Sequence, residues 1–185
     1  MTPRAMLLAL PLAALSIAPF RSAILPSQLL PIYGGSGGTA FSRDCGAGKV
    51  LTGLRYRAGL LVDAVGLLCS PVLSNGALGP ETTVGSLAGG GGGTSGAVSC
   101  ASGNVVRQAR IWHGSFVNGI QIVCKTWDAG SRKWLGADQY PARVGRNDTL
   151  NSDAESCTAP TQPASGIRGR ASALVDAIGF ICDEP

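Results

Sequence analysis

The sequence has 185 residues, of which 45% are hydrophobic and 14% charged, with a formal net charge of +4 at pH 7. This length and composition fit one globular domain or two small ones. The basic excess is too small and too scattered for a nucleic-acid interface, which concentrates Lys and Arg on one face, so no nucleic-acid partner is expected.

Residues 1–23 are predicted to be a signal peptide and leader, followed by one domain at 24–185. Arg4 supplies a positive charge before an uncharged run rich in Leu and Ala, from Ala5 to Ala18. That run is too short to span a bilayer, and no other segment is longer and equally apolar, so no membrane span is expected in the mature protein. A secreted, extracellular protein is therefore predicted. An uncleaved anchor or a surface helix is the alternative, and the cleavage point stays open.

The first part of the domain has the pattern of β-strands. Residues 54–57 alternate Leu and Tyr with two arginines, the two-residue period of a half-buried strand. A second strand carries Val65 and Leu67 on the same face as Cys69. Asn75-Gly76 then marks a hairpin turn. These segments predict an antiparallel hairpin with a larger, core-facing side.

The same pattern recurs twice, with a period of about 55 residues. Three pairs of cysteines mark the recurrence: Cys45 and Cys69, Cys100 and Cys124, and Cys157 and Cys182. The opening Gly37-Gly38-Thr39 recurs as Gly92-Gly93-Thr94 and, less faithfully, as Asn147-Asp148-Thr149. The repeats span about 33–79, 88–136 and 143–185.

The repeat also favours one disulfide pattern. Six cysteines in an exported chain indicate disulfides, and six allow 15 pairings. Only pairing within each unit gives every cysteine an equivalent place, which predicts Cys45–Cys69, Cys100–Cys124 and Cys157–Cys182. Exchange of partners between units is the alternative.

The predicted fold is all-β, because the three units show strand periodicity and none shows a capped helix. A unit of this size cannot bury its apolar face alone. Three equivalent sheets can pack around a common axis, which gives a closed three-sided prism with one core and less than about 10% helix.

Two families resemble parts of this chain. Residues 33–41, Tyr-Gly-Gly-Ser-Gly-Gly-Thr-Ala-Phe, resemble the glycine-rich opening strand of jacalin-related lectins, and residues 166–180, which end in Val-Asp-Ala-Ile-Gly-Phe, resemble their closing segment. The paired cysteines and Val117-Asn118-Gly119-Ile120 resemble instead the vitelline membrane outer layer proteins. Both resemblances imply the type I β-prism, with three pseudo-threefold-related antiparallel sheets, over about residues 33–182.

The lectin resemblance implies a sugar site between a Gly-Gly turn that opens one unit and a Gly-x-x-x-Asp turn of the preceding unit. Glycines let the backbone approach a ligand, and a carboxylate accepts charge-assisted hydrogen bonds from adjacent hydroxyls. Three such pairs are conceivable, ranked here by how much of the pattern they keep: Gly59-Leu60-Leu61-Val62-Asp63 with the loop at 89–93 that contains Gly92 and Gly93; Ser172-Ala173-Leu174-Val175-Asp176 with the loop at 34–38 that contains Gly37 and Gly38; and Gly114-Ser115-Phe116-Val117-Asn118 with Asn147-Asp148.

Each of these residues also has a structural interpretation. Asp63 and Asp176 could cap their turns by accepting backbone amides, as Asn118 would do equally well. Leu60 and Leu61 could be packing residues, and the glycine run at 89–93 could be a flexible linker.

Other chemistry has little support in the sequence. His113, the one imidazole, stands where the other units have Ala58 and Ala171, so it is expected to be an exposed loop residue. The sequence contains no Cys-x-x-Cys pair, so no metal is expected, and no cofactor either. The glutamates at 81, 155 and 184 are expected at non-equivalent loop or terminal positions, and no glycosidase pair is indicated. The three tryptophans are expected to pack in the core or at its rim.

The sequence thus favours an exported, non-catalytic carbohydrate-binding protein for mannose-like or glucan-like glycans. The alternative is a disulfide-hardened structural protein of a coat or matrix, of the vitelline membrane outer layer type, with no small-molecule site. The acid at the turn favours the lectin, whereas the three disulfides and Asn118 favour the structural protein.

Overall fold

The computed structural model describes residues 25–146, 151–159 and 161–185, so the predicted signal peptide lies outside the described residues. Fourteen β-strands and no helix occur in these ranges, which confirms the all-β prediction. No helix long and apolar enough to cross a membrane occurs among the residues described.

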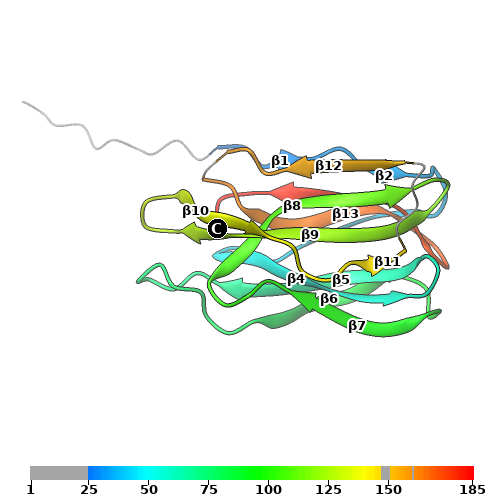
Figure 1. Ribbon diagram of the computed structural model, residues 1–185, viewed down its shortest axis with the longest axis horizontal. Helices are drawn as coiled ribbons and strands as arrows, with labels where there is room; N and C mark the ends of the chain where they lie inside the picture. Colours follow the sequence, from blue (N-terminus) through cyan, green and yellow to red (C-terminus); the bar gives the residue numbers. More distant parts are fainter. Residues whose placement is uncertain (1–24, 147–150, 160) are drawn as a thin grey trace, which may run out of the picture.

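The strands form three antiparallel sheets around one core (Figure 1). Sheet I has the order β6-β5-β4-β7 and contains β4 (Lys49–Ala58), β5 (Val62–Pro71), β6 (Thr82–Gly89) and β7 (Thr94–Ser99). Sheet II has the order β10-β9-β8-β12, with β11 also paired to β9, and contains β8 (Asn104–His113), β9 (Val117–Asp128), β10 (Lys133–Gln139), β11 (Val144–Gly145) and β12 (Ser152–Ser156). Sheet III has the order β1-β14-β13-β3, with β2 also paired to β14, and contains β1 (Gln28–Leu29), β2 (Tyr33–Gly34), β3 (Thr39–Asp44), β13 (Ala164–Ala171) and β14 (Val175–Cys182).

Each sheet combines strands from two successive sequence units. The central hairpin of a sheet comes from one unit, and the edge strand beside it opens the next unit; β7, for example, pairs with β4. Sheet III closes the ring, because its hairpin of β13 and β14 pairs with β1, β2 and β3 from the beginning of the chain. The three sheets confirm the predicted β-prism.

The inner faces of the three hairpins fill the common core. Leu54 and Leu67 of sheet I, Ile122 of sheet II and Ile167 of sheet III are fully buried there, in one cluster with the cysteines. Burial of such a side chain contributes about 1.5–3 kcal/mol. A second, smaller cluster forms around Trp127.

Three disulfides form as predicted: Cys45–Cys69, Cys100–Cys124 and Cys157–Cys182. In each pair the first cysteine directly follows the edge strand of one sheet and the second lies in the central hairpin of the next sheet. The disulfides therefore link III to I, I to II and II to III. Each closes a chain loop of about 25 residues, for which loop entropy gives roughly 3 kcal/mol.

Candidate carbohydrate site

The three central hairpins turn at the same end of the prism, to the right in Figure 1, which we call the loop end. Each turn is closed by the same backbone bond: the amide of Gly59, Gly114 or Ser172 donates to the carbonyl two residues later, at 2.9, 3.0 and 2.8 Å. The turn is therefore built alike in all three sheets. The cysteines lie toward the opposite end, which we call the disulfide end.

In sheet I the loop at 89–93 lies directly over Asp63. The amide of Gly90 donates to the Asp63 carbonyl at 2.9 Å, which fixes the start of the loop. A Cβ built on Gly92 would lie 2.2 Å from Asp63 Oδ1, and one on Gly93 would lie 2.4 Å from Oδ2. Only glycine permits this approach, so the loop backbone and the carboxylate form one surface.

Sheet III repeats this arrangement with Asp176 and the loop at 34–38. The amide of Gly35 donates to the Asp176 carbonyl at 2.8 Å. A Cβ on Gly37 or Gly38 would lie 2.3 or 2.4 Å from the Asp176 carboxylate oxygens. The structure thus brings together the residues that the sequence paired in the first and second candidate sites.

The two carboxylates do not act as turn caps. Among the described residues, no backbone amide donates to the side chain of Asp63 or Asp176; Asp176 accepts only from Ser172 Oγ, at 3.4 Å. Asp44 and Asp128, in contrast, accept amides from Gly46 and Gly130, both at 2.9 Å. The carboxylates of the two loop-end aspartates therefore keep acceptor capacity for another partner.

The glycine run of sheet I is packed and is not a free linker. Gly89 has φ +125°, and a Cβ on it would lie 2.1 Å from the Asp63 carbonyl. Gly90 lies against the neighbouring sheet, where a Cβ would come within 2.3 Å of the Ala173 carbonyl oxygen in the turn of the second site. Close packing on both sides accounts for these glycines.

Two arginines hold the glycine loops from the strand side. Arg57 of β4 donates from Nε to the Gly92 carbonyl at 2.6 Å and from Nη2 to the Gly93 carbonyl at 2.8 Å. Arg170 of β13 makes the same two bonds to Gly37 and Gly38, both at 2.7 Å. These arginines engage the loop carbonyls and so orient both loops identically.

Sequence reasoning treated Arg57 only as part of an alternating strand. The signal that could have identified it is the repeat itself, since Arg57 and Arg170 stand at the same place in the units that face a Gly-Gly loop. The second unit has Trp112 there. Trp112 is buried, and the guanidinium of Arg143 lies 4.9 Å from the centre of its ring.

The third candidate site departs from the other two in length as well. The amide of Arg146 donates to the Asn118 carbonyl at 2.8 Å, as Gly35 and Gly90 do to their aspartates. The His113 amide then donates to the carbonyl of Asn151. At the equivalent positions of the other sheets, the residues opposite the end of the hairpin strand are Thr94 and Thr39. This connection is one residue longer, so Thr149 is not the equivalent of those threonines. Asn147 and Asp148 lie outside the described residues.

Two details of the hairpin turns bear on the alternative roles of Leu60 and Leu61 and on the ranking of the candidate sites. Leu60 is 72% exposed, so it is not a packing residue, whereas Leu61 is half-buried. Gly59 has no left-handed φ, and a Cβ on it would meet only Gly93 Cα, at 4.0 Å. Ser172 at the equivalent position is therefore no departure in backbone shape. The two sites match in backbone but not in burial, because Asp176 is only 3% exposed and Asp63 is half-buried.

The prediction that His113 is an exposed loop residue is wrong. It ends β8 with its side chain only 17% exposed, and Nε2 lies 2.8 Å from Asp153 Oδ2. Its ring lies 5.5 Å from that of Tyr33, whose hydroxyl donates to Glu155. That hydrogen bond, with burial and the nearby negative charges, raises the Tyr33 pKa to about 12, because the protonated hydroxyl is stabilised as a donor to a carboxylate. Glu155 itself lies in β12 and not in a loop.

Comparison with known proteins finds similarity in the fold. No family model and no curated protein matches the sequence. A mannose-binding jacalin-related lectin from Ananas comosus is similar with a TM-score of 0.59 and 19% identity, over 86% of this chain and 99% of that chain. Malaysian banana lectin gives 0.58 and 17%, over 86% and 100%. A mannose-specific jacalin-related lectin from Morus nigra, solved with mannose, gives 0.53 and 15%, over 91% and 99%. The chain therefore has the β-prism fold of the jacalin-related lectins.

Proposed function

We propose that this protein is an exported carbohydrate-binding protein with two sugar sites at the loop end. The first site is Asp63 with the loop at 89–93, and the second is Asp176 with the loop at 34–38. One observation carries the proposal: each carboxylate lies against a Gly-Gly backbone and, among the described residues, accepts no backbone amide. A polar side chain held in this way is suited to a ligand rich in hydroxyls.

The chemistry of such a site needs only hydrogen bonds. Two adjacent sugar hydroxyls donate to one carboxylate, and amides of the glycine loop donate to sugar oxygens. A hydrogen bond to a charged group contributes about 1.5–3 kcal/mol, so a few of them give weak but specific binding. Mannose-like and glucan-like glycans are the proposed ligands, since they present adjacent hydroxyls of this kind.

Binding without catalysis fits the composition of each site. Glycoside hydrolysis generally uses two carboxylates that flank the scissile bond. The residues of each proposed site include one carboxylate, Asp63 or Asp176. No group of side chains suited to a metal ion occurs among the described residues, and the proposed binding needs none.

A glycan array tests the proposal on the mature protein with its disulfides intact. We expect binding to mannose-rich or glucan oligosaccharides, and its loss in the double variant Asp63→Asn with Asp176→Asn. Asn118→Ala is the matched control and should bind as the wild type does. Absence of binding to every glycan offered would refute the proposal and favour the structural coat protein.

A further inference from the structure

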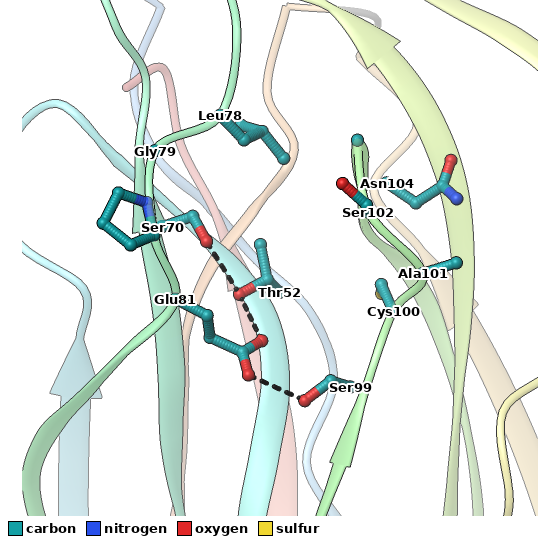
Figure 2. A pocket seen from close by; sticks show the side chains of 12 residues that line it. Thr52, Ser70, Leu78, Gly79, Glu81, Ser99, Cys100, Ala101, Ser102 and Asn104 are labelled. Atoms are coloured by element: carbon teal, nitrogen blue, oxygen red, sulfur yellow. Dashed lines mark hydrogen bonds between the residues drawn. The ribbon is translucent and has the colours of Figure 1, made fainter.

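A pocket separate from the proposed sugar sites lies on sheet I toward the disulfide end, where Cys100 is part of its lining (Figure 2). It has a volume of about 400 Å³ and is lined by strand residues and by the chain at 100–104, beside a wall at 78–80. Figure 2 shows the Glu81 carboxylate between Thr52 and Ser99. Glu81 Oε2 accepts from Thr52 Oγ1 and Oε1 accepts from Ser99 Oγ, both at 2.8 Å, and Ser70 Oγ lies 3.3 Å from Thr52 Oγ1.

Sheet II provides an internal comparison for Glu81. Thr82 pairs with Cys69 and Gln139 pairs with Cys124, so Glu81 and Asp138 each directly precede the residue that pairs with the second cysteine of the unit; Asp138 lies in a register shift of its strand.

The hydroxyl residues of the pocket also have counterparts in sheet II. Thr52 lies 17 residues before the second cysteine of its unit, as Arg107 does, and Ser70 directly follows that cysteine, as Lys125 does. In sheet II these two cations contact Asp138, at 3.1 Å from Arg107 and 3.4 Å from Lys125. The carboxylate there is neutralised from within the chain.

Sheet I keeps the carboxylate and lacks both cations. Thr52 and Ser70, buried and uncharged, stand at the places of Arg107 and Lys125, and both line the pocket. The lining contains no Lys, Arg or His, and Glu81 forms no ion pair among the described residues. The pocket therefore has one negative charge, several hydroxyls and room for a small molecule.

We propose that this pocket binds a small organic cation that carries a primary ammonium and hydroxyl groups, such as an amino sugar. The ammonium supplies to Glu81 the charge that Arg107 and Lys125 supply to Asp138, through up to three N–H donors. The hydroxyl oxygens of Thr52 and Ser99, which donate to Glu81, accept hydrogen bonds from ligand hydroxyls, and Ser70 offers a further hydroxyl. The volume is in the range of small-molecule pockets, and the polar lining disfavours apolar ligands.

The affinity should be modest and sensitive to salt. Glu81 is exposed at the edge of the pocket, where water screens an ion pair. The site does not depend on the proposed sugar sites, since it uses other residues at the other end of the prism.

Amide NMR titration of the mature, disulfide-intact protein tests this proposal. D-glucosamine at slightly acidic pH, where its amine is protonated, should shift the amides of Glu81, Ser99 and Ser102. Neutral D-glucose and N-acetylglucosamine should act on these amides at least tenfold more weakly. Equal shifts with glucose and glucosamine, or no shift in the pocket, would overturn the proposal.

Two variants complete the test. Glu81→Gln should weaken glucosamine binding at least tenfold, and Ser70→Lys, which places a cation as in sheet II, should abolish it while the fold and thermal melt are kept. Asp63→Asn with Asp176→Asn removes two carboxylates elsewhere and should leave this titration unchanged. Unchanged binding by either pocket variant would contradict the proposal, and Ser70→Lys decides the case if Glu81→Gln fails to fold.

Discussion

At the loop end, sheets I and III differ from sheet II in one set of residues. Sheets I and III combine an arginine, a Gly-Gly loop and an aspartate, whereas sheet II has Trp112, a longer connection and Asn118. The hairpin turn and its backbone bond are the same in all three. The fold therefore needs the turn but not the arginine, the glycines or the acid, and their joint presence in two sheets points to a ligand.

The largest effect on sugar binding should come from a side chain placed between the glycine loop and the aspartate. Gly92→Val places a side chain where the Asp63 carboxylate lies, since even a Cβ would be 2.2 Å from Oδ1. We expect sugar binding at the first site to be lost and the second site to be kept. Titration calorimetry should then show one sugar per chain in place of two. A stoichiometry that stays at two would contradict the assignment.

The second-largest effect on sugar binding should come from substitution of the aspartates themselves. Asp63→Asn removes the charge that accepts sugar hydroxyls and should cost about 1.5–3 kcal/mol at its site, or roughly 10- to 150-fold in affinity. The sequence alone favoured a smaller cost for Asp176→Asn, because Ser172 departs from the motif. The matched backbone of the two sites now predicts comparable costs. Calorimetry of both variants beside a thermal melt measures this, and unchanged affinity for both would identify the aspartates as structural.

A moderate effect is expected from the arginine that holds the loop. Arg57→Ala removes two hydrogen bonds to the carbonyls of Gly92 and Gly93 and should weaken the first site severalfold, or about 1 kcal/mol after allowance for its exposure to water. Arg55→Ala is the matched control on the same strand, because Arg55 donates to the Gly85 carbonyl in β6 and not to the glycine loop. Equal effects of the two variants would show that Arg57 does not position the site.

The smallest effect should come from Ser172→Gly. It restores the motif glycine of the second site, yet the turn already has an ordinary backbone conformation there. We expect affinity to change by less than about 0.5 kcal/mol, as for a neutral surface change. A gain of tenfold or more in calorimetry would mean that the serine hydroxyl obstructs the site.

The features that recur could be predicted from the sequence. Strand periodicity, the prism and the three disulfides follow from a pattern that is repeated three times. Such a repeat is a stronger signal than any single residue. Contacts between units could not be predicted in this way. His113 is partly buried because β12 and β2, distant in sequence, lie beside the end of β8.

The candidate site shows the same limit. The sequence paired each aspartate with its glycine loop through a family resemblance, and the structure brings these residues together. It did not identify Arg57 and Arg170, because an arginine on a half-exposed strand looks like an ordinary surface residue. It also aligned Thr149 with Thr94 by spacing, whereas strand pairing places Asn151 there.

The crystal structure of the mature protein soaked with a mannose oligosaccharide tests the central claim most directly. The account predicts one sugar at Asp63 and one at Asp176, each with two hydroxyls on the carboxylate and further contacts to the glycine loop, and none at Asn118. Sugar bound only elsewhere on the prism, or at all three turns alike, would contradict it.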